Sequence, residues 1–367
     1  YFARESCNRI YCRCSIHHRS MGCGASNTYK APRKIETKWF HQFESELPSQ
    51  QGKVVCITGC TSGTGFVAAK ALARKGAHVV MLNRKSSRAE EAEKKILEEV
   101  PGSKVTFVEC DLQTFENVKS CAEKLKAMFS DTGVDVLCNN AGVMALADEA
   151  TKDGYDVQMQ TNHLSHFLLT KEIFPLLQKG AELRGEARIV NHSSAAREKA
   201  GAVTGKVLDA KYLGKNGGNL GGNSKSVMFG GARWQRYHQT KLANVVFTLA
   251  LDDRLKACKS KVKAVVCAPG LAATNLQVTA NQNDGMSDTW IMRYGQSAED
   301  GTMPLLHCCA GAGVEGGDFY EPKIRKLGMR LIGPVAKFEL EKICTKEESR
   351  QILWEESEKA CGEFKIE

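Results

Sequence analysis

The chain has 367 residues, 42% of them hydrophobic and 25% charged, with a formal net charge of +9. This length and composition are those of a globular protein with a sizeable core, and they exclude a fibrous or wholly disordered chain. No window approaches eighteen consecutive apolar residues, so the sequence predicts no membrane-spanning helix.

The positive charge is concentrated at the start of the chain. Residues 1–40 hold eight Lys or Arg residues against two Glu residues, a net +6, which leaves only +3 for the remainder. Because the rest is close to charge-balanced, we predict no nucleic-acid partner.

Residues 1–50 are predicted to be a basic, disordered tail, and residues 51–367 a single domain. Within the tail, "MGCGAS" fits the N-myristoylation pattern at Gly22, with Cys23 beside it as a candidate for palmitoylation. If Met21 is the true start, two such signals would anchor a cytoplasmic protein peripherally to a membrane. The alternatives are an Arg-rich transit segment for a plastid or another organelle, and a chance match.

Most of the fifteen cysteines are scattered singly through apolar runs, as at Cys56, Cys110, Cys138 and Cys267. Cysteines in such positions usually pack as small hydrophobic core residues. Free thiols of this kind indicate a reduced intracellular compartment. The Cys and His residues within 12–18 lack the second half of a zinc motif, so no metal site is predicted.

From about residue 52, short apolar runs alternate with amphipathic stretches of helical length. The predicted strands span 53–59, 77–82, 104–110, 134–140, 187–194, 261–270 and 316–320. Strands rich in β-branched residues and separated by helices indicate an α/β fold, a doubly wound parallel sheet of about seven strands with helices on both faces.

Two longer segments interrupt this alternation, at 195–232 and 271–297. Each follows the carboxyl end of a predicted strand, where ligands bind in this architecture. The first is rich in Gly and Asn, and we interpret it as a lid-like insertion, with a plain surface insertion as the alternative.

The segment "TGCTSGTG" (58–65) follows the first strand and opens the first helix. Gly59 permits a tight turn, while Gly63 and Gly65 let the backbone approach a pyrophosphate at the helix amino terminus. At the end of the second strand stands Asn83, where NAD-preferring proteins commonly carry an acid, and Arg84 follows it. This arrangement favours the 2′-phosphate of NADP over NAD.

Further along the chain stand "CDL" (110–112), "NNAG" (139–142), "SS" (193–194), "YHQTK" (237–241) and "APG" (268–270). With these motifs in this order after the glycine-rich segment, the chain resembles the short-chain dehydrogenase/reductase family. The resemblance covers about 52–363 and is greatest to the retinol-dehydrogenase-like branch, which includes the WW-domain oxidoreductase and protochlorophyllide reductases. It implies a Rossmann-type fold and hydride transfer between NADP(H) and a carbonyl or alcohol. The segment before Tyr237 is similar to that of protochlorophyllide reductases, but Leu271 stands where those enzymes carry a cysteine.

The resemblance also implies a set of cofactor-binding residues along the carboxyl edge of the sheet. They are Gly59, Ser62, Gly63, Thr64, Gly65, Arg84, Asp111, Leu112, Asn140, Ala141, Gly142, Tyr237, Lys241, Pro269, Gly270 and Thr274.

Tyr237 and Lys241 are four residues apart in a predicted helix, hence on one face, so the ammonium can lower the pKa of the phenol and make it an acid/base. By the resemblance, Ser194 holds the substrate oxygen and Asn162 holds a water linked to the lysine. For Asn162 a helix cap is the alternative. His163, His166 and His238 have no partner at metal-ligand spacing.

The intact Ser194, Tyr237 and Lys241 favour an enzyme acting on a lipophilic substrate, such as a retinal-like, steroid-like or other aldehyde or ketone. Two alternatives remain, reduction of a C=C bond as in protochlorophyllide reductases, and a non-catalytic NADP-binding sensor. By resemblance, two copies would pair through the helices that hold Asn162 and Tyr237.

Overall fold

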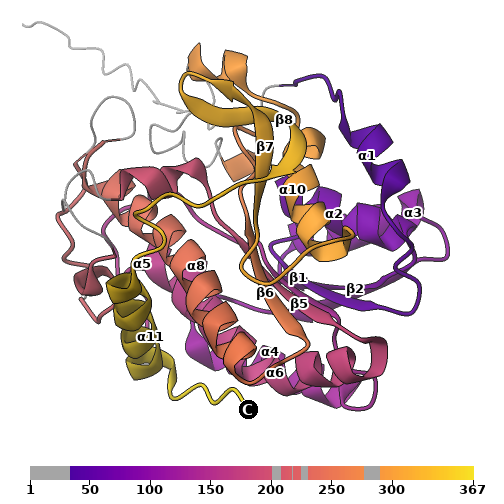
Figure 1. Cartoon of the computed structure of the whole chain (residues 1–367), viewed down its shortest axis with the longest axis horizontal. Coiled ribbons are helices and arrows are strands. Elements are labelled where there is room, and N and C mark those ends of the chain that lie inside the picture. The colour runs from indigo at the N-terminus through magenta and orange to yellow at the C-terminus, as the bar shows by residue number, and fades with distance from the viewer. Residues whose placement is uncertain (1–33, 201–207, 217, 225–229, 277–289) are drawn as a thin grey trace, which may run out of the picture. The chain divides into compact units, whose positions relative to one another are not determined.

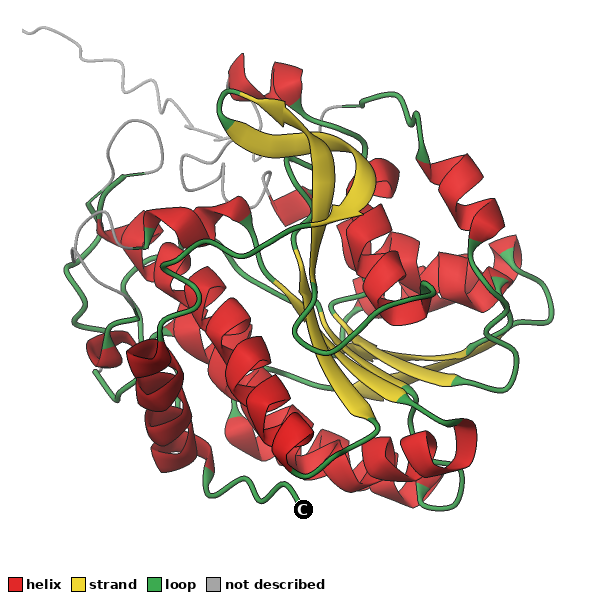
Figure 2. Cartoon of the chain, in the orientation of Figure 1, coloured by secondary structure: helices red, strands yellow, loops and turns green. Residues whose placement is uncertain are grey.

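An eight-stranded sheet forms the centre of the computed structural model, which describes residues 34–200, 208–216, 218–224, 230–276 and 290–367 (Figures 1 and 2). The candidate acylation residues Gly22 and Cys23 lie outside these ranges. The strands are β1 (Val54–Thr58), β2 (His78–Asn83), β3 (Lys104–Glu109), β4 (Val136–Asn139), β5 (Ala187–His192), β6 (Val262–Cys267), β7 (Phe319–Lys326) and β8 (Met329–Lys337).

The helices are α1 (Phe40–Glu46), α2 (Gly63–Arg74), α3 (Ser87–Glu99), α4 (Phe115–Phe129), α5 (Val157–Met159), α6 (Ser165–Arg184), α8 (Ala232–Ala257), α10 (Ala298–Ala310) and α11 (Glu347–Cys361). A wide π-helical turn, η1 (Gln160–Leu164), joins α5 to α6, and short 3-10 turns occur at η2 (Ala195–Lys199), η3 (Ala210–Tyr212) and η4 (Trp290–Tyr294). No helix of the described residues combines the length and the apolar character needed to cross a membrane.

The strand order is β3-β2-β1-β4-β5-β6-β7-β8, and every pair is parallel except β7 with β8. The chain runs outward from β1 in one direction and then from β4 in the other. The predicted doubly wound parallel sheet is therefore confirmed, with its switch point between β1 and β4.

Side chains of the central strands alternate between two cores. Val55 and Ile57 of β1 pack in the core beneath α2 and α10, while Cys56 packs in the core beneath α4, α6 and α8. Because both faces are covered, the strands are apolar at nearly every position, as expected for a buried parallel sheet. Cys56, Cys110, Cys138 and Cys267 are all buried free thiols, as their apolar context predicted.

Residues before the predicted domain boundary at residue 51 pack on the domain. The buried Asp300 carboxylate of α10 accepts hydrogen bonds from the backbone N–H groups of Lys38, Trp39 and Phe40, at 2.9–3.0 Å. These bonds satisfy the free donors at the start of α1, and the Phe40 side chain is buried. Residues 34–50 thus pack on the domain, and their disorder was wrongly predicted.

The sequence also did not predict the eighth strand. β8 pairs antiparallel with β7 across a tight turn at Leu327 and Gly328, both with positive φ. Gly333 and Pro334 interrupt its apolar pattern, and β7 itself continues past Pro322 with irregular register. Such residues usually mark loops, but they are tolerated in a strand at the sheet edge.

The last helix, α11, packs across α8 and covers an aromatic cluster. The Trp354 ring stacks on Phe364 with centroids 5.6 Å apart, and it meets Phe167 edge-on at 5.3 Å. The Arg254 guanidinium, which extends from α8, lies 3.7 Å from the centre of the Trp354 ring. The C-terminal segment thus completes the core beside α8.

We expect Trp354→Ala to lower the free energy of unfolding by about 3–5 kcal/mol, since it leaves a cavity among these rings. Chemical denaturation followed by circular dichroism measures the change. Leu97→Ala is the matched control, because Leu97 is 41% exposed, and it should shift stability by less than about 0.5 kcal/mol. Equal effects of the two substitutions would contradict a structural role for α11.

Candidate active site

A cavity of about 670 Å³ opens at the carboxyl ends of the parallel strands. Every predicted cofactor-binding residue lines it except Gly65, which lies beneath the glycine-rich turn. Ser194, Tyr237 and Lys241 line it too, whereas Asn162 lies behind its wall. The structure therefore brings together predicted site residues that are up to 215 positions apart in the chain, as Gly59 and Thr274 are.

The glycine-rich turn is shaped by contacts that exclude side chains. A Cβ on Gly65 would lie 2.2 Å from the Gly59 carbonyl oxygen and 2.4 Å from Asn140 Nδ2. Gly59 and Gly63 both have positive φ, and a Cβ on Gly63 would press on Thr274 at 3.1 Å. The backbone is thus left bare at the amino terminus of α2, where its free N–H groups can meet an anion.

Asn140 joins this turn to the ends of β4 and β5. Its Nδ2 donates to the carbonyl oxygens of Thr58 and Gly59, at 2.8 and 3.2 Å. Its Oδ1 accepts from the Thr64 hydroxyl at 3.1 Å and from His192 Nδ1 at 2.9 Å. His192 was not predicted as a site residue, because a histidine in an apolar strand gives no signal of such a contact.

The far end of the cavity lies at the end of β2. Asn83 Oδ1 accepts a hydrogen bond from the Cys60 backbone N–H at 2.7 Å, while its buried Nδ2 has no partner among the described residues. Asn83 therefore keeps an unpaired donor, while its amide oxygen already accepts one hydrogen bond. Arg84, Lys85 and Arg88 line the same end, and no described residue forms an ion pair with Arg84.

Tyr237 and Lys241 extend from one face of α8, with the Lys241 nitrogen 5.8 Å from the centre of the Tyr237 ring. Lys241 Nζ donates to the His192 carbonyl oxygen at 3.0 Å. Ser194 hydrogen-bonds to Tyr237, whereas the Ser193 hydroxyl donates to the Lys241 carbonyl oxygen at 2.7 Å. Only the second serine is thus directed at the tyrosine, as the family pattern implied.

The pKa of Tyr237 is raised by burial, and the Ser194 hydrogen bond opposes this only in part. Burial thus decides the direction of the shift in the pKa of Tyr237, and the lowering by Lys241 stays a prediction. Burial acts on the lysine as well and lowers the pKa of Lys241 to about 8. Both groups are enclosed, and desolvation penalises the charged form of each.

Asn162 lies within η1, and it does not cap a helix, since Asp156 accepts from the N–H groups that open α5. Its Oδ1 accepts from Val143 N at 2.8 Å, and its Nδ2 donates to the Val143 carbonyl oxygen and the Thr240 hydroxyl, both at 2.9 Å. These bonds hold the loop segment after Asn140, which contains Val143, against α8. His163 and His166 are buried and hydrogen-bonded nearby, as core residues.

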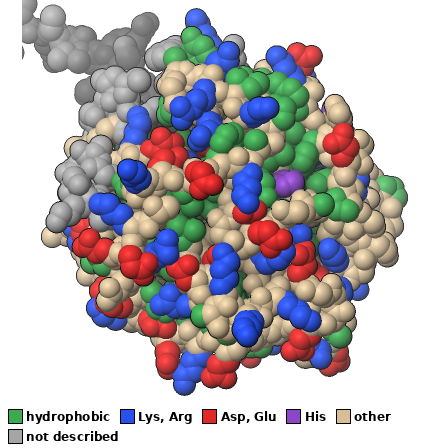
Figure 3. All heavy atoms as spheres, in the orientation of Figure 1, with side chains coloured by type: hydrophobic (Ala, Val, Ile, Leu, Met, Phe, Trp, Pro, Cys, Tyr) green, Lys and Arg blue, Asp and Glu red, His purple; other side chains and the backbone are tan. Residues whose placement is uncertain are grey.

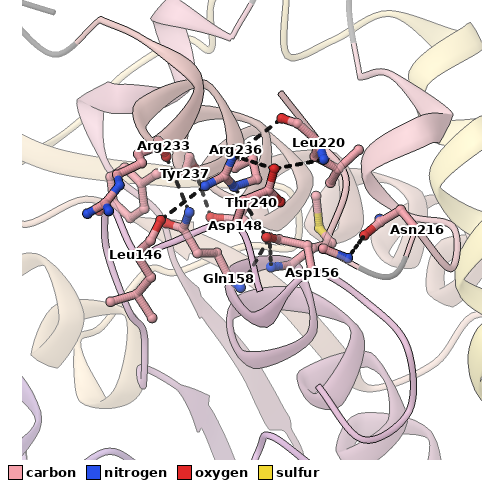
Figure 4. A network of polar contacts seen from close by, with 12 residues as sticks. Leu146, Asp148, Asp156, Gln158, Asn216, Leu220, Arg233, Arg236, Tyr237 and Thr240 are labelled. Carbon is pink, nitrogen blue, oxygen red and sulfur yellow. Dashed lines mark hydrogen bonds and ion pairs between the residues drawn. The ribbon is translucent and has the colours of Figure 1, made fainter. Parts of the chain in front are cut away.

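Two fully buried arginines flank the site, and neither was predicted. Arg236 donates to the carbonyl oxygens of Leu146, Leu220 and Gly222, and it lies 3.4–3.5 Å from Asp148 and Asp156 (Figure 4). Burial raises the pKa of Asp156 to about 6. This network fastens residues 218–224 of the insertion to the body of the domain, one residue before Tyr237.

Arg197 lies on the other side, in η2, three residues after Ser194. Its guanidinium donates to both carboxylate oxygens of Glu341, at 2.7 and 3.0 Å, and it lies 3.4 Å from Glu321 and over the Phe319 ring. It therefore ties the segment that carries Ser194 to β7 and to the chain after β8.

The end of the cavity beside Tyr237 is apolar. Met144, Ala145, Trp234 and Tyr237 form a small buried cluster against which Ala196 and Leu276 pack. His238 lies at this end, 4% exposed, with no hydrogen-bond partner for either ring nitrogen among the described residues. Burial lowers the pKa of His238 to about 4, so the ring is neutral at pH 7.

The two interrupting segments contribute unequally to the cavity. Leu271, Ala272, Thr274, Asn275, Leu276 and Ile291 of the second line it. Within the described residues, the first lines it only through Ala195, Ala196 and Lys199, and Tyr212 and Leu213 are buried in the core below α11. The described part of 208–224 therefore packs beside the site instead of covering it.

Comparison with known proteins places this geometry in context. A family model described as short chain dehydrogenase matches residues 53–206. An oxidoreductase of Schizosaccharomyces pombe is 37% identical over 253 residues, 68% of each chain, and bovine retinol dehydrogenase 12 is 32% identical over 266 residues, 72% of this chain and 75% of its own. A crystal structure of a Mycobacterium paratuberculosis protein has a TM-score of 0.66 at 29% identity, covering 91% of this chain and all of the other.

The buried Lys241 gives a pH-dependent prediction. Its pKa of about 8 in the folded protein lies below the ordinary value, so the unfolded chain binds more protons between about pH 8 and 10.4. Stability should rise with pH through this window, and below it the charged ammonium destabilises the fold by roughly 3 kcal/mol.

Lys241→Met should therefore be more stable than the original chain at pH 7, by roughly 2–3 kcal/mol, and the difference should vanish towards pH 10. The His192 carbonyl keeps Asn244 as a donor at 3.0 Å, so the variant leaves no orphaned acceptor. Denaturation of the ligand-free protein at several pH values measures this, with Lys94→Met as an exposed control. A variant that is less stable at every pH would contradict the prediction.

Proposed function

Since the chain belongs to the short-chain dehydrogenase family, in its retinol-dehydrogenase-like branch, and is an oxidoreductase by that membership, we propose that it reduces a lipophilic aldehyde or ketone with NADPH, and oxidises the alcohol in reverse. The observation that carries the proposal is the enclosed group of Ser194, Tyr237 and Lys241 at the junction of a polar and an apolar half of one cavity.

The residues present suit a dinucleotide. The side-chain-free turn at Gly59, Gly63 and Gly65 would hold the pyrophosphate, and Asp111 and Leu112 would lie by the adenine. Asn140, Ala141 and Gly142 would contact the ribose near the nicotinamide, and Pro269, Gly270 and Thr274 the ring itself. When bound, the nicotinamide supplies or accepts the hydride.

The protein's own residues handle the proton. A phenol whose pKa is raised by burial stays protonated at neutral pH, so Tyr237 is ready to donate its proton to the oxygen of a carbonyl that gains a hydride. Ser194 would hold that oxygen through its hydroxyl. The Lys241 ammonium, beside the ring, would stabilise the phenolate that remains.

An NADP preference is supported by the end of β2. Asn83 presents an amide donor, and Arg84, Lys85 and Arg88 are cations, so this end suits a 2′-phosphate better than a 2′-hydroxyl that needs an acceptor.

The apolar end of the cavity supports a lipophilic substrate, as does the similarity to a retinol dehydrogenase. Neutral His238 adds one donor and one acceptor there, which would suit a polar group on an otherwise apolar substrate. We retain peripheral membrane attachment through Gly22 and Cys23 as a proposal. A homodimer through α6 and α8 stays a prediction; α11 packs on both of these helices in the structure.

Tyr237→Phe tests the proposed role. We expect it to reduce turnover of retinal or a medium-chain aldehyde by about 10²–10⁴-fold, because the proton donor is lost. NADPH binding, measured by fluorescence titration, should change by less than about threefold, since the ring and its packing remain.

Tyr212→Phe, at a buried tyrosine that does not line the cavity, is the control and should retain turnover. If the original chain binds NADPH but oxidises it with no aldehyde, ketone or quinone, the non-catalytic sensor is the better reading. Reduction of a conjugated C=C bond alone would favour the protochlorophyllide reductase-type reaction.

Arg84→Ala should weaken NADPH binding by about 10–100-fold, as expected for a lost charged contact to a phosphate, and leave NADH binding unchanged. Lys94→Ala, on the exposed side of α3, should alter neither. Dissociation constants from parallel titrations with both cofactors decide this, and a chain that already prefers NADH would disprove the NADP assignment.

A further inference from the structure

The β7–β8 hairpin extends beyond the sheet to which it belongs. β7 pairs with β6 only at Phe319 and Tyr320, and from Lys323 onward its residues are exposed and pair only with β8. Figure 1 shows this hairpin rising past the other strands at the top of the view. We call residues 323–330 the hairpin tip.

The hairpin tip is strongly basic. It contains Lys323, Arg325, Lys326 and Arg330, and no acidic residue occurs between Glu321 and Glu339. Arg330 is neutralised by Glu321 at 2.5 Å, but Lys323, Arg325 and Lys326 form no ion pair with any described residue. Among the described residues these three cations are thus left without an ion-pair partner, and Arg325 acts on Glu198 only at longer range, where it opposes the rise in the pKa of that carboxyl.

The same tip exposes large apolar side chains. Ile324 is 37% exposed and Leu327 47%, and Tyr294 of η4, which packs on β8, is 38% exposed. The other large apolar side chains that are exposed in the described residues, Leu97, Met128 and Leu183, lie singly on α3, α4 and α6. In Figure 3, basic and apolar side chains gather at the top of the molecule, where the hairpin lies.

The hairpin also forms part of the cavity wall. Met329 and Leu331 line the cavity, and Leu331 packs against Leu271, Ile291 and Met292. The Leu331 carbonyl oxygen accepts from the Leu271 N–H at 2.8 Å. The exposed tip is thus continuous with the apolar wall of the cavity.

We propose that the hairpin tip docks the protein on an anionic phospholipid surface, with Leu327 and Ile324 inserted among the lipids and Lys323, Arg325 and Lys326 at the headgroups. Apolar side chains flanked by cations are the combination that binds such an interface. The tip has only eight residues, 323–330, against the roughly 20–30 residues that each partner contributes to a stable protein complex, so a lipid surface fits better than an acidic protein. Docking here would bring the apolar cavity wall to a membrane that holds lipophilic substrates.

The test is flotation of the unacylated full-length chain with vesicles of phosphatidylcholine, with or without phosphatidylserine. We expect binding that requires phosphatidylserine and weakens with salt. Because each cation near an anionic surface contributes about fivefold, the triple variant Lys323→Ser, Arg325→Ser and Lys326→Ser should lose about 100-fold. Ile324→Ser with Leu327→Ser should lose about tenfold or more.

The matched controls are Lys94→Ser with Lys95→Ser for charge and Leu183→Ser for apolar exposure, and both should bind as the original chain does. The basic tail is present in every variant, so its own contribution cancels. NADPH binding by the hairpin variants should be unchanged, which separates lost docking from lost folding.

A local reporter tests insertion directly. Leu327→Trp should show a blue shift of the difference fluorescence on phosphatidylserine vesicles, and Leu183→Trp should not. Vesicle binding that is equal in the original chain and both hairpin variants, or the absence of a shift at Leu327→Trp, overturns the proposal. Binding to an acidic protein without binding to vesicles overturns it as well.

Discussion

The hydrogen bonds of the Asn140 side chain are the constraint on which the site depends. One amide group holds the turn after β1 through Thr58 and Gly59, and it also meets His192 at the end of β5. His192 in turn receives the Lys241 ammonium on its carbonyl oxygen. The glycine-rich turn and the Ser194, Tyr237 and Lys241 group are therefore fixed relative to each other through two residues.

The cavity contains buried charged and polar side chains at positions where a packed core normally holds apolar ones. Lys241 is buried with a lowered pKa, His238 has no partner among the described residues, and Asn83 keeps an unpaired donor. The buried charge of Lys241 and the unpartnered polar atoms of His238 and Asn83 each lower stability, because burial removes the water that would otherwise solvate them. Their coincidence in one cavity is typical of a binding site, where a ligand completes the missing contacts.

The local parts of this site could be predicted from sequence, whereas its long-range supports could not. Gly59, Gly63 and Gly65 lie in a strand–turn–helix pattern, and Tyr237 and Lys241 are one helical turn apart, so short-range rules sufficed. Arg197 and Arg236 instead find acids up to 144 residues away, which no spacing indicates. The strand β8 was not predicted for another reason, since Gly333 and Pro334 are turn-forming residues that are accommodated only in an edge strand.

The pKa of Tyr237 shows how the surroundings decide what a motif does. Spacing alone suggested that a cation would lower it, yet enclosure by Met144, Trp234 and their neighbours raises it. A second apolar cluster, which includes Leu271 and Leu331, lines the same cavity and continues through Met329 into the β7–β8 hairpin. Burial in the first of these clusters keeps the phenol protonated at neutral pH, while the second leads outward to the basic, apolar hairpin tip.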